Sequence, residues 1–148
     1  MSLADRLALT DLVHRYAALV DDRQFEKAAA LFADTAELIV PNPPEQLGPT
    51  VDYRGPAGVL DALAALRGLA RTRHEIVGEV YDIGRGTATG RIACVAHHWS
   101  VRDGVIGDAA WHLRYDDAYA LDGDDWRFTR RALTIDAIET PTVRRVRA

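Results

Sequence analysis

The chain has 148 residues, a mass of 16.3 kDa, a formal charge of −4 and 48% hydrophobic residues. This size and composition predict a single globular domain that can bury its own core. A protein that binds nucleic acid is usually basic, so the acidic balance speaks against a nucleic-acid partner. The single cysteine, Cys94, excludes an intrachain disulfide, and its apolar neighbours indicate a buried, inert thiol.

The chain shows no pattern that is typical of a membrane or secreted protein. Its first residues lack a basic segment followed by a continuous apolar segment. No apolar stretch approaches the roughly 18 residues needed to cross a bilayer. We therefore expect a soluble, cytoplasmic protein without a membrane partner.

The first half of the chain has helical periodicity. Ser2 and Asp5 form a capping-box pattern ahead of a helix over residues 3–20. A pair of aspartates then separates it from a second helix, in which Phe25, Ala28, Ala29 and Phe32 share one face. A short strand is expected over 35–40, a proline-rich loop over 41–49 and a third helix over 55–70.

The second half has the pattern of strands. Segments 72–83, 87–101, 105–121 and 126–139 are rich in β-branched and aromatic residues and are separated by turns. Three helices followed by antiparallel strands form an α+β order. A long curved sheet around a helix leaves an apolar cavity, which is a common ligand site. We expect one domain over 1–140 and a mobile C-terminal tail over 141–148, which can close a pocket or meet a partner.

A few polar residues are candidates for chemistry in such a cavity. His74 lies near the start of a long strand, and the unperturbed histidine pKa of about 6.5 allows proton transfer near neutral pH. Asp21 lies at the end of the first helix, where the helix dipole disfavours a carboxylate. A carboxylate there can orient a histidine and stabilise its cation, or simply cap the next helix. Asp22 is the rival for either role.

Other candidates have weaker patterns. Tyr16 offers a phenol as a hydrogen-bond donor, although its place on the apolar stripe also fits the core. His97 and His98 are adjacent on a strand, so only one of them faces the cavity, and the pattern does not decide which. The histidines lack the spacing of a zinc motif, so we expect no metal ion. No cofactor is expected either.

Aromatic and basic side chains complete the candidate site. Aromatic rings on the strands can stack against an apolar ligand or fill the core, and a buried arginine can bind an anionic group or pair with Asp116 or Asp117. The residues expected to contact the substrate are Trp99, Trp111, Tyr115, Phe25 and Arg130.

Over about residues 3–138 the chain resembles the SnoaL-like branch of the nuclear-transport-factor-2-like (NTF2-like) superfamily. The strings that carry this resemblance are Tyr16–Asp21, Phe25–Glu37, Tyr53–Gly58, Thr72–Glu75 and Asp122–Phe128. The resemblance implies a cone-shaped, cystatin-like α+β barrel, with three N-terminal helices packed on a curved, mostly antiparallel sheet. It also implies a homodimer or higher homo-oligomer.

The resemblance implies a function as well. The family includes scytalone dehydratase, bile-acid 7α-dehydratase and lindane dehydrochlorinase, which use an Asp–His dyad; Asp21 and His74 stand at its positions. The family further suggests roles for Tyr16 and a second histidine, with His97 preferred over His98. We expect a cofactor-independent dehydratase that acts on a hydrophobic, hydroxylated cyclic molecule of polyketide or steroid type. The alternatives are an isomerase or polyketide cyclase with the same base, and a non-enzymatic module that binds small molecules.

Overall fold

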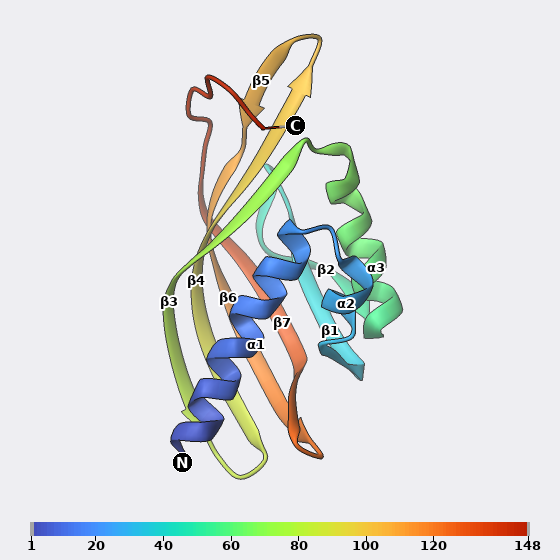
Figure 1. Cartoon of the computed structure of the whole chain (residues 1–148), viewed down its shortest axis with the longest axis vertical. Helices are drawn as coiled ribbons and strands as arrows, with labels where there is room; N and C mark the ends of the chain where they lie inside the picture. The colour runs from blue at the N-terminus through green and yellow to red at the C-terminus, as the bar shows by residue number, and fades with distance from the viewer. Residues whose placement is uncertain (1, 148) are drawn as a thin grey trace.

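A computed structural model describes residues 2–147, so Met1 and Ala148 lie outside the described residues. Helices cover the concave face of one curved sheet, and the opposite face of the sheet carries no helix in the described chain (Figure 1). The predicted α+β architecture is therefore confirmed.

Helix α1 (Leu3–Asp21) begins as the capping pattern predicts. The Ser2 hydroxyl accepts a hydrogen bond from the Asp5 N–H at 3.0 Å and donates one to the Asp5 carboxylate at 2.6 Å. The Trp126 indole also donates to this carboxylate, which joins the start of α1 to the last strand. The buried stripe of α1 packs against the sheet and consists of Leu9, Leu12, Val13, Tyr16, Ala17 and Val20.

The other helices are shorter than the sequence pattern suggests. Helix α2 (Phe25–Ala29) ends early because Phe32 already begins strand β1 (Phe32–Asn42). Helix α3 (Gly55–Ala64) has proline in its first turn, as predicted, and continues as the 3₁₀ helix η1 (Ala65–Gly68). Gly55 has a φ of +66°, and a Cβ there would lie 2.8 Å from the Asp34 carbonyl oxygen. This close approach requires glycine.

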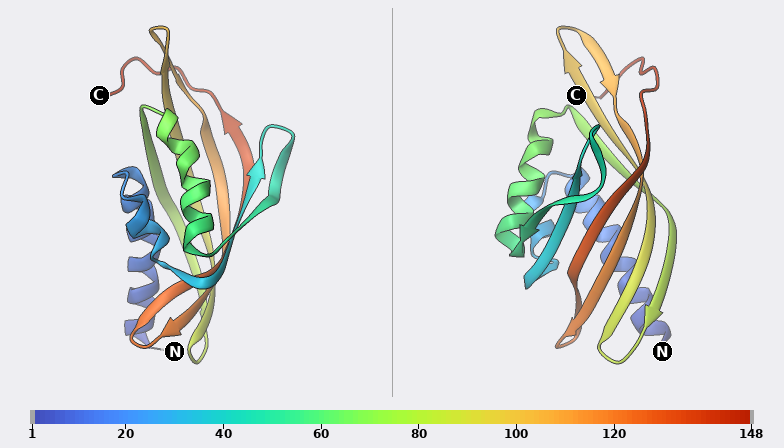
Figure 2. Two further views of the ribbon diagram at one scale, coloured as in Figure 1. Left: turned by 90° about the vertical axis from the view of Figure 1, so that its right-hand side faces the viewer. Right: turned by 180° about the vertical axis from the view of Figure 1, so that it is seen from behind.

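The sheet is mostly antiparallel and strongly twisted (Figure 2). Its remaining strands are β2 (Gln46–Arg54), β3 (Arg71–Ile83), β4 (Thr87–Arg102), β5 (Val105–Asp108), β6 (Ala110–Asp122) and β7 (Asp125–Glu139). The order is β2-β1-β7-β6-β4-β3, with β5 paired to β4, and β1–β7 is a parallel pair. The long strands β3, β4, β6 and β7 form the curved wall on which α1 lies.

One loop prediction and one strand prediction are wrong in their boundaries. The expected loop over 41–49 is largely sheet, since β1 continues to Asn42 and β2 begins at Gln46. Pro49 is tolerated because β2 is an edge strand of the sheet. The expected strand over 105–121 is interrupted at Ala109. There the buried Asp108 side chain accepts a hydrogen bond from the His98 N–H at 3.0 Å, and the interruption separates β5 from β6.

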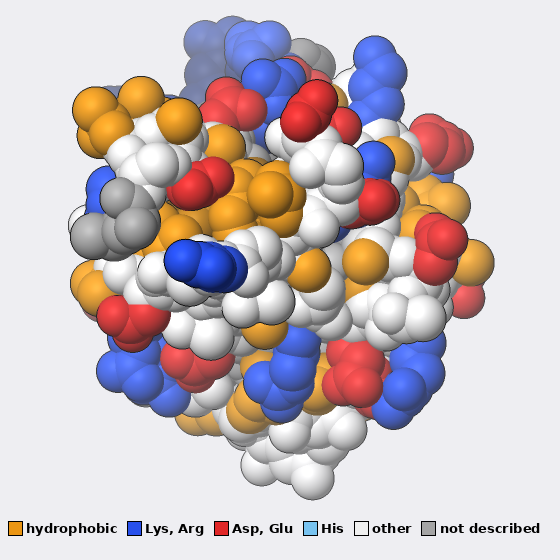
Figure 3. Space-filling model, turned by 90° about the horizontal axis from the view of Figure 1, so that it is seen from below, with side chains coloured by type: hydrophobic (Ala, Val, Ile, Leu, Met, Phe, Trp, Pro, Cys, Tyr) orange, Lys and Arg blue, Asp and Glu red, His pale blue; other side chains and the backbone are white. Residues whose placement is uncertain are grey.

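The surface has a mixed character. Seen from below, charged side chains of both signs lie among hydrophobic ones (Figure 3).

Beyond β7, residues 140–147 form no helix or strand, and the Arg71 guanidinium donates to the Arg147 carbonyl oxygen at 2.8 Å. Across residues 2–147, no helix has the length and apolarity required to cross a membrane.

Candidate active site

Asp21 and His74 form a close pair between the end of α1 and the start of β3. The Asp21 Oδ1 and the His74 Nδ1 are 2.7 Å apart, and Asp21 Oδ2 accepts the His74 backbone N–H at 2.8 Å. The Thr72 hydroxyl donates to Asp21 Oδ1 at 3.0 Å. Because the carboxylate accepts from Nδ1, the neutral imidazole carries its proton there and has a bare Nε2.

The alternatives for Asp21 do not match this geometry. The N-cap of α2 is Gln24, without a side-chain capping bond, so Asp21 does not cap the second helix. Asp22 is exposed and provides the C-cap of α1. The side chain of His74 is only 9% exposed, so its bond to Asp21 is shielded from most of the solvent.

His74 lies on the wall of a cavity of about 430 Å³ between the sheet, α1, α3 and η1. Its lining has no aspartate, glutamate, lysine or arginine, so the polar groups are those of histidine, tyrosine and tryptophan. The lining residues are Tyr16, Leu38, Val40, Pro41, Tyr53, Ala62, Leu63, Ala65, Leu66, Leu69, His74, Ala96, His98, Trp111, Leu113, Tyr115 and Leu133. This composition suits a neutral, largely apolar ligand.

The second histidine at the cavity is His98, and His97 is not brought to it. The inward face of β4 carries Cys94, Ala96 and His98, all nearly inaccessible to solvent. His97 is on the outer face, where its Nδ1 lies 2.6 Å from the Asp108 carboxylate and its ring stacks on Trp99. The preference for His97 over His98, which the family resemblance suggested, is therefore wrong about which histidine lines the cavity.

His98 has a defined orientation and electrostatic environment. Its Nδ1 donates to the Ala109 carbonyl oxygen at 2.7 Å, and its ring lies 4.3 Å from that of Trp111 and 6.3 Å from that of His74. Burial lowers the pKa of His98, and the neighbouring His74 adds to this effect. A neutral His98 with its proton on Nδ1 presents Nε2 as a hydrogen-bond acceptor.

Tyr16 and Tyr115 line the cavity, as predicted, and a buried arginine lies behind them. The Arg131 guanidinium carbon is 3.7 Å from the centroid of the Tyr115 ring and 4.7 Å from that of Tyr16. Arg131 is wholly inaccessible to solvent and makes two hydrogen bonds of 2.9 Å to Asp117. Burial raises the pKa of Tyr16 to about 12, although Arg131 opposes this effect.

Three residues expected to contact the substrate lie elsewhere. Trp99 is on the outer face of the sheet beside His97, and Phe25 is buried in the core beneath the Arg67 guanidinium. Arg130 also faces outward, because β7 skips Thr129 in its pairing with β6. This bulge reverses the alternation that starts at Trp126, and it turns Arg131 inward in place of Arg130.

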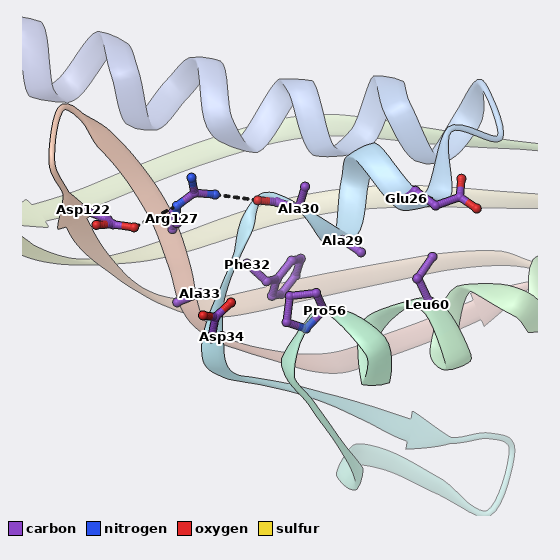
Figure 4. A pocket seen from close by; sticks show the side chains of 10 residues that line it. All are labelled: Glu26, Ala29, Ala30, Phe32, Ala33, Asp34, Pro56, Leu60, Asp122 and Arg127. Carbon is purple, nitrogen blue, oxygen red and sulfur yellow. Dashed lines mark hydrogen bonds and ion pairs between the residues drawn. The ribbon is translucent and has the colours of Figure 1, made fainter.

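A second hollow, of about 420 Å³, lies between α2, α3 and the start of β7 (Figure 4). No histidine lines it, and Arg127 there is already bonded to the Ala30 carbonyl oxygen at 2.6 Å and to Asp122.

Burial raises the pKa of Cys94 to about 12, so this thiol is not an activated nucleophile. Among residues 2–147, no three histidine, cysteine or acidic side chains are arranged to hold a metal ion.

A helix-covered curved sheet around one ligand-sized apolar cavity defines the class of cone-shaped α+β proteins. Within this class, the chain belongs to the SnoaL-like domain family, whose sequence model matches residues 1–132. The resemblance recognised from the sequence is thereby confirmed. No curated protein matches the chain significantly in sequence.

Solved structures with the same fold cover nearly the whole chain. A candidate scytalone dehydratase from Novosphingobium aromaticivorans is 21% identical with a TM-score of 0.80, and the match covers 96% of this chain and 91% of that one. A type 2 hexachlorocyclohexane dehydrochlorinase, LinA, is 19% identical with a TM-score of 0.81, covering 99% and 95%. An NTF2-like protein with a cystatin-like fold, also from N. aromaticivorans, is 22% identical with a TM-score of 0.70, covering 87% and 80%.

Proposed function

We propose that this protein is a cofactor-independent lyase, a dehydratase of a neutral, hydroxylated cyclic small molecule. The observation that carries the proposal is the bond between Asp21 and His74 at the wall of a cavity lined without charged side chains. A histidine supported by a carboxylate is a general base that works near neutral pH. Two of the similar structures, a candidate dehydratase and a dehydrochlorinase, are named for elimination reactions, which agrees with this chemistry.

In the proposed reaction, His74 Nε2 removes a proton from the carbon next to the one that bears the hydroxyl group. The electrons of the broken C–H bond form the new C=C bond, the C–O bond breaks, and the hydroxyl leaves as water after it receives a proton. Asp21 stabilises the imidazolium that His74 becomes, without taking its proton. Assistance by a general base contributes about 10²–10⁴-fold to the rate.

Tyr16 is the proton donor in this proposal, and His98 orients the substrate. With a pKa of about 12, the Tyr16 phenol stays protonated at neutral pH and can hydrogen-bond the departing oxygen. The bare Nε2 of His98 accepts a hydrogen bond from a second hydroxyl group of the substrate. Since no charged side chain lines the cavity, a carboxylate or phosphate on the substrate would lose its hydration without compensation.

The test is a screen of neutral hydroxylated bicyclic and tricyclic compounds, followed by mass spectrometry of the products. A dehydratase yields a product that is lighter than the substrate by one water. An isomerase or cyclase that uses the same base without losing water yields a product of unchanged mass. The variant His74→Gln is expected to lose activity. The matched control is His14→Gln, because His14 is an exposed histidine of α1 that does not line the cavity.

Each outcome is informative. Loss of water that depends on His74 but not on His14 supports the proposal. Binding of these compounds without any product would instead identify a binding module, and full activity of His74→Gln would exclude the dyad as the base.

A further inference from the structure

The turn after Asp21 has an unusual residue at its left-handed position. Helix α1 ends in a Schellman motif, in which the Gln24 N–H bonds to the Leu19 carbonyl oxygen at 2.8 Å and the Arg23 N–H to that of Val20 at 3.1 Å. The residue at the left-handed position of this motif is usually glycine, yet here it is Arg23, with a φ of 62°. The chain therefore accepts backbone strain in order to place an arginine side chain at this point.

That side chain reaches another part of the chain. Arg23 Nη1 donates to the Leu66 carbonyl oxygen at 2.5 Å, and Nη2 donates to the Leu69 carbonyl oxygen at 2.6 Å. Both carbonyls lie at the end of η1, where the Leu69 N–H already bonds to Leu66. Two parallel donors from one planar guanidinium hold both acceptors in a fixed relative position, which lysine cannot do.

The segment held by Arg23 forms part of the cavity wall and leads directly into the strand that carries His74. The side chains of Leu66 and Leu69 line the cavity, and β3 begins only two residues after Leu69. His74 follows on β3, bonded to Asp21, which precedes Arg23 by two residues. We call Leu66 and Leu69 the leucine wall. Through the bonds of Arg23 and Asp21, the end of α1 is therefore connected both to the leucine wall and to the strand that carries His74.

We propose that Arg23 is a positioning residue that fixes the distance between the leucine wall and the Asp21–His74 dyad, and thereby limits the size of the substrate. The inference rests on the proposed use of this cavity as the substrate site. The dyad itself does not need Arg23, because Asp21 is also held by Thr72 and by the His74 backbone. Loss of the guanidinium therefore loosens the wall while the base remains paired.

The variants Arg23→Gly and Arg23→Lys test this role. Glycine relieves the strain of the turn, so Arg23→Gly is expected to fold, and Arg23→Lys retains the charge with at most one of the two bonds. The control is Arg127→Gln, since Arg127 also bonds to a backbone carbonyl, at the hollow away from the cavity. Hydrogen exchange, followed by mass spectrometry of the peptide over 65–71, is expected to accelerate about tenfold or more in Arg23→Gly, less in Arg23→Lys, and not in the control Arg127→Gln.

A second readout is independent of general stability. The affinities for 2-naphthol and the larger 2-anthrol are measured in each variant, and their ratio is expected to shift at least about threefold towards 2-anthrol in Arg23→Gly. On a substrate found by the screen, kcat is expected to fall about 10–100-fold, because small misplacements have effects of this order. Arg23→Lys is expected to lie between wild type and Arg23→Gly in each measurement.

The results distinguish this inference from the proposed function. Unchanged exchange over 65–71, or an unchanged affinity ratio, in a folded Arg23→Gly variant would overturn the role of Arg23 even if the dyad is catalytic. If no compound is converted, the exchange and the probe affinities still decide whether Arg23 holds the wall. If Arg23→Gly does not fold, the same two measurements on Arg23→Lys decide it, and wild-type values there would refute the inference.

Discussion

The bond between Asp21 and His74 is most directly tested by Asp21→Asn, which changes one oxygen to an amide nitrogen. The carboxylate accepts three hydrogen bonds, from Thr72 at 3.0 Å and from the His74 N–H and Nδ1 at 2.8 and 2.7 Å. An asparagine has only one acceptor oxygen. If that oxygen keeps the His74 N–H, the amide nitrogen faces Nδ1 and the imidazole must move its proton to Nε2.

The size of the effect follows from this change of tautomer. A histidine protonated on Nε2 has no lone pair towards the cavity, so it cannot act as the base. We expect kcat to fall by about 10²–10⁴-fold, which is the range that general acid–base catalysis contributes, and an amide in place of a catalytic triad's carboxylate has an effect at the upper end of this range. The folded state loses a partly buried acceptor, so the free energy of unfolding is expected to fall by about 1–3 kcal/mol.

Two assays check the prediction. Long-range ¹⁵N–¹H NMR correlation identifies the protonated ring nitrogen of His74, which is expected to be Nδ1 in the wild type and Nε2 in Asp21→Asn. The product assay then measures kcat. Asp22→Asn is the control, because it makes the same chemical change at the exposed neighbouring position. A His74 that keeps its proton on Nδ1 in Asp21→Asn, or a kcat within threefold of wild type, would refute the reasoning.

Three further predictions concern the buried polar groups. Tyr16→Phe is expected to lower kcat about 10–100-fold, and the wild-type pH–rate profile is expected to show no loss from tyrosine ionisation below about pH 10, because the pKa of Tyr16 is raised to about 12. Burial lowers the pKa of His98, so on acidification the unfolded chain takes up this proton first, and the folded state loses stability below about pH 6.5. Urea unfolding at pH 5 and 7.5 measures the free energy of unfolding, and its decrease on acidification is expected to be smaller in His98→Gln than in the wild type, by up to about 1.4 kcal/mol per pH unit. Arg131→Met leaves Asp117 buried without its partner and is expected to cost about 3–5 kcal/mol in urea unfolding, whereas Arg131→Met combined with Asp117→Leu is expected to recover most of this loss.

Much of the fold is readable from local patterns. Ser2 and Asp5 mark the start of α1, and the glycine-containing turns mark the ends of the long strands, because these signals depend on neighbouring residues. The start of the edge strand β2 is not predicted because Gly48 and Pro49 resemble a loop, and only the place of β2 at the sheet edge makes Pro49 tolerable. The break at Ala109 follows Asp108, whose partners are the His98 N–H and the His97 imidazole on another strand, and local sequence does not reveal such partners.

The candidate site is also only partly predictable from the sequence, because local patterns mark some of its residues and contacts between strands decide the others. Asp21 and His74 were found from a helix end and a strand start, and the structure brings them into contact. The choice between His97 and His98 requires knowledge of which face of β4 lines the cavity, and the alternating pattern of β4 is apolar on both faces. The sequence pattern indicates only that Arg130 and Arg131 face opposite ways, and the choice of Arg130 is wrong because the bulge that turns Arg131 inward has no signature in the sequence.

The buried Arg131 limits which substitutions can change the ligand specificity of the cavity. The rings of Tyr16 and Tyr115 are both the floor of the cavity and the cover of the Arg131 guanidinium. A smaller residue at either position would deepen the cavity but admit water to a buried ion pair. Variants with altered specificity are therefore expected to arise on the side formed by α3 and η1, where leucine can be exchanged without exposing a charge.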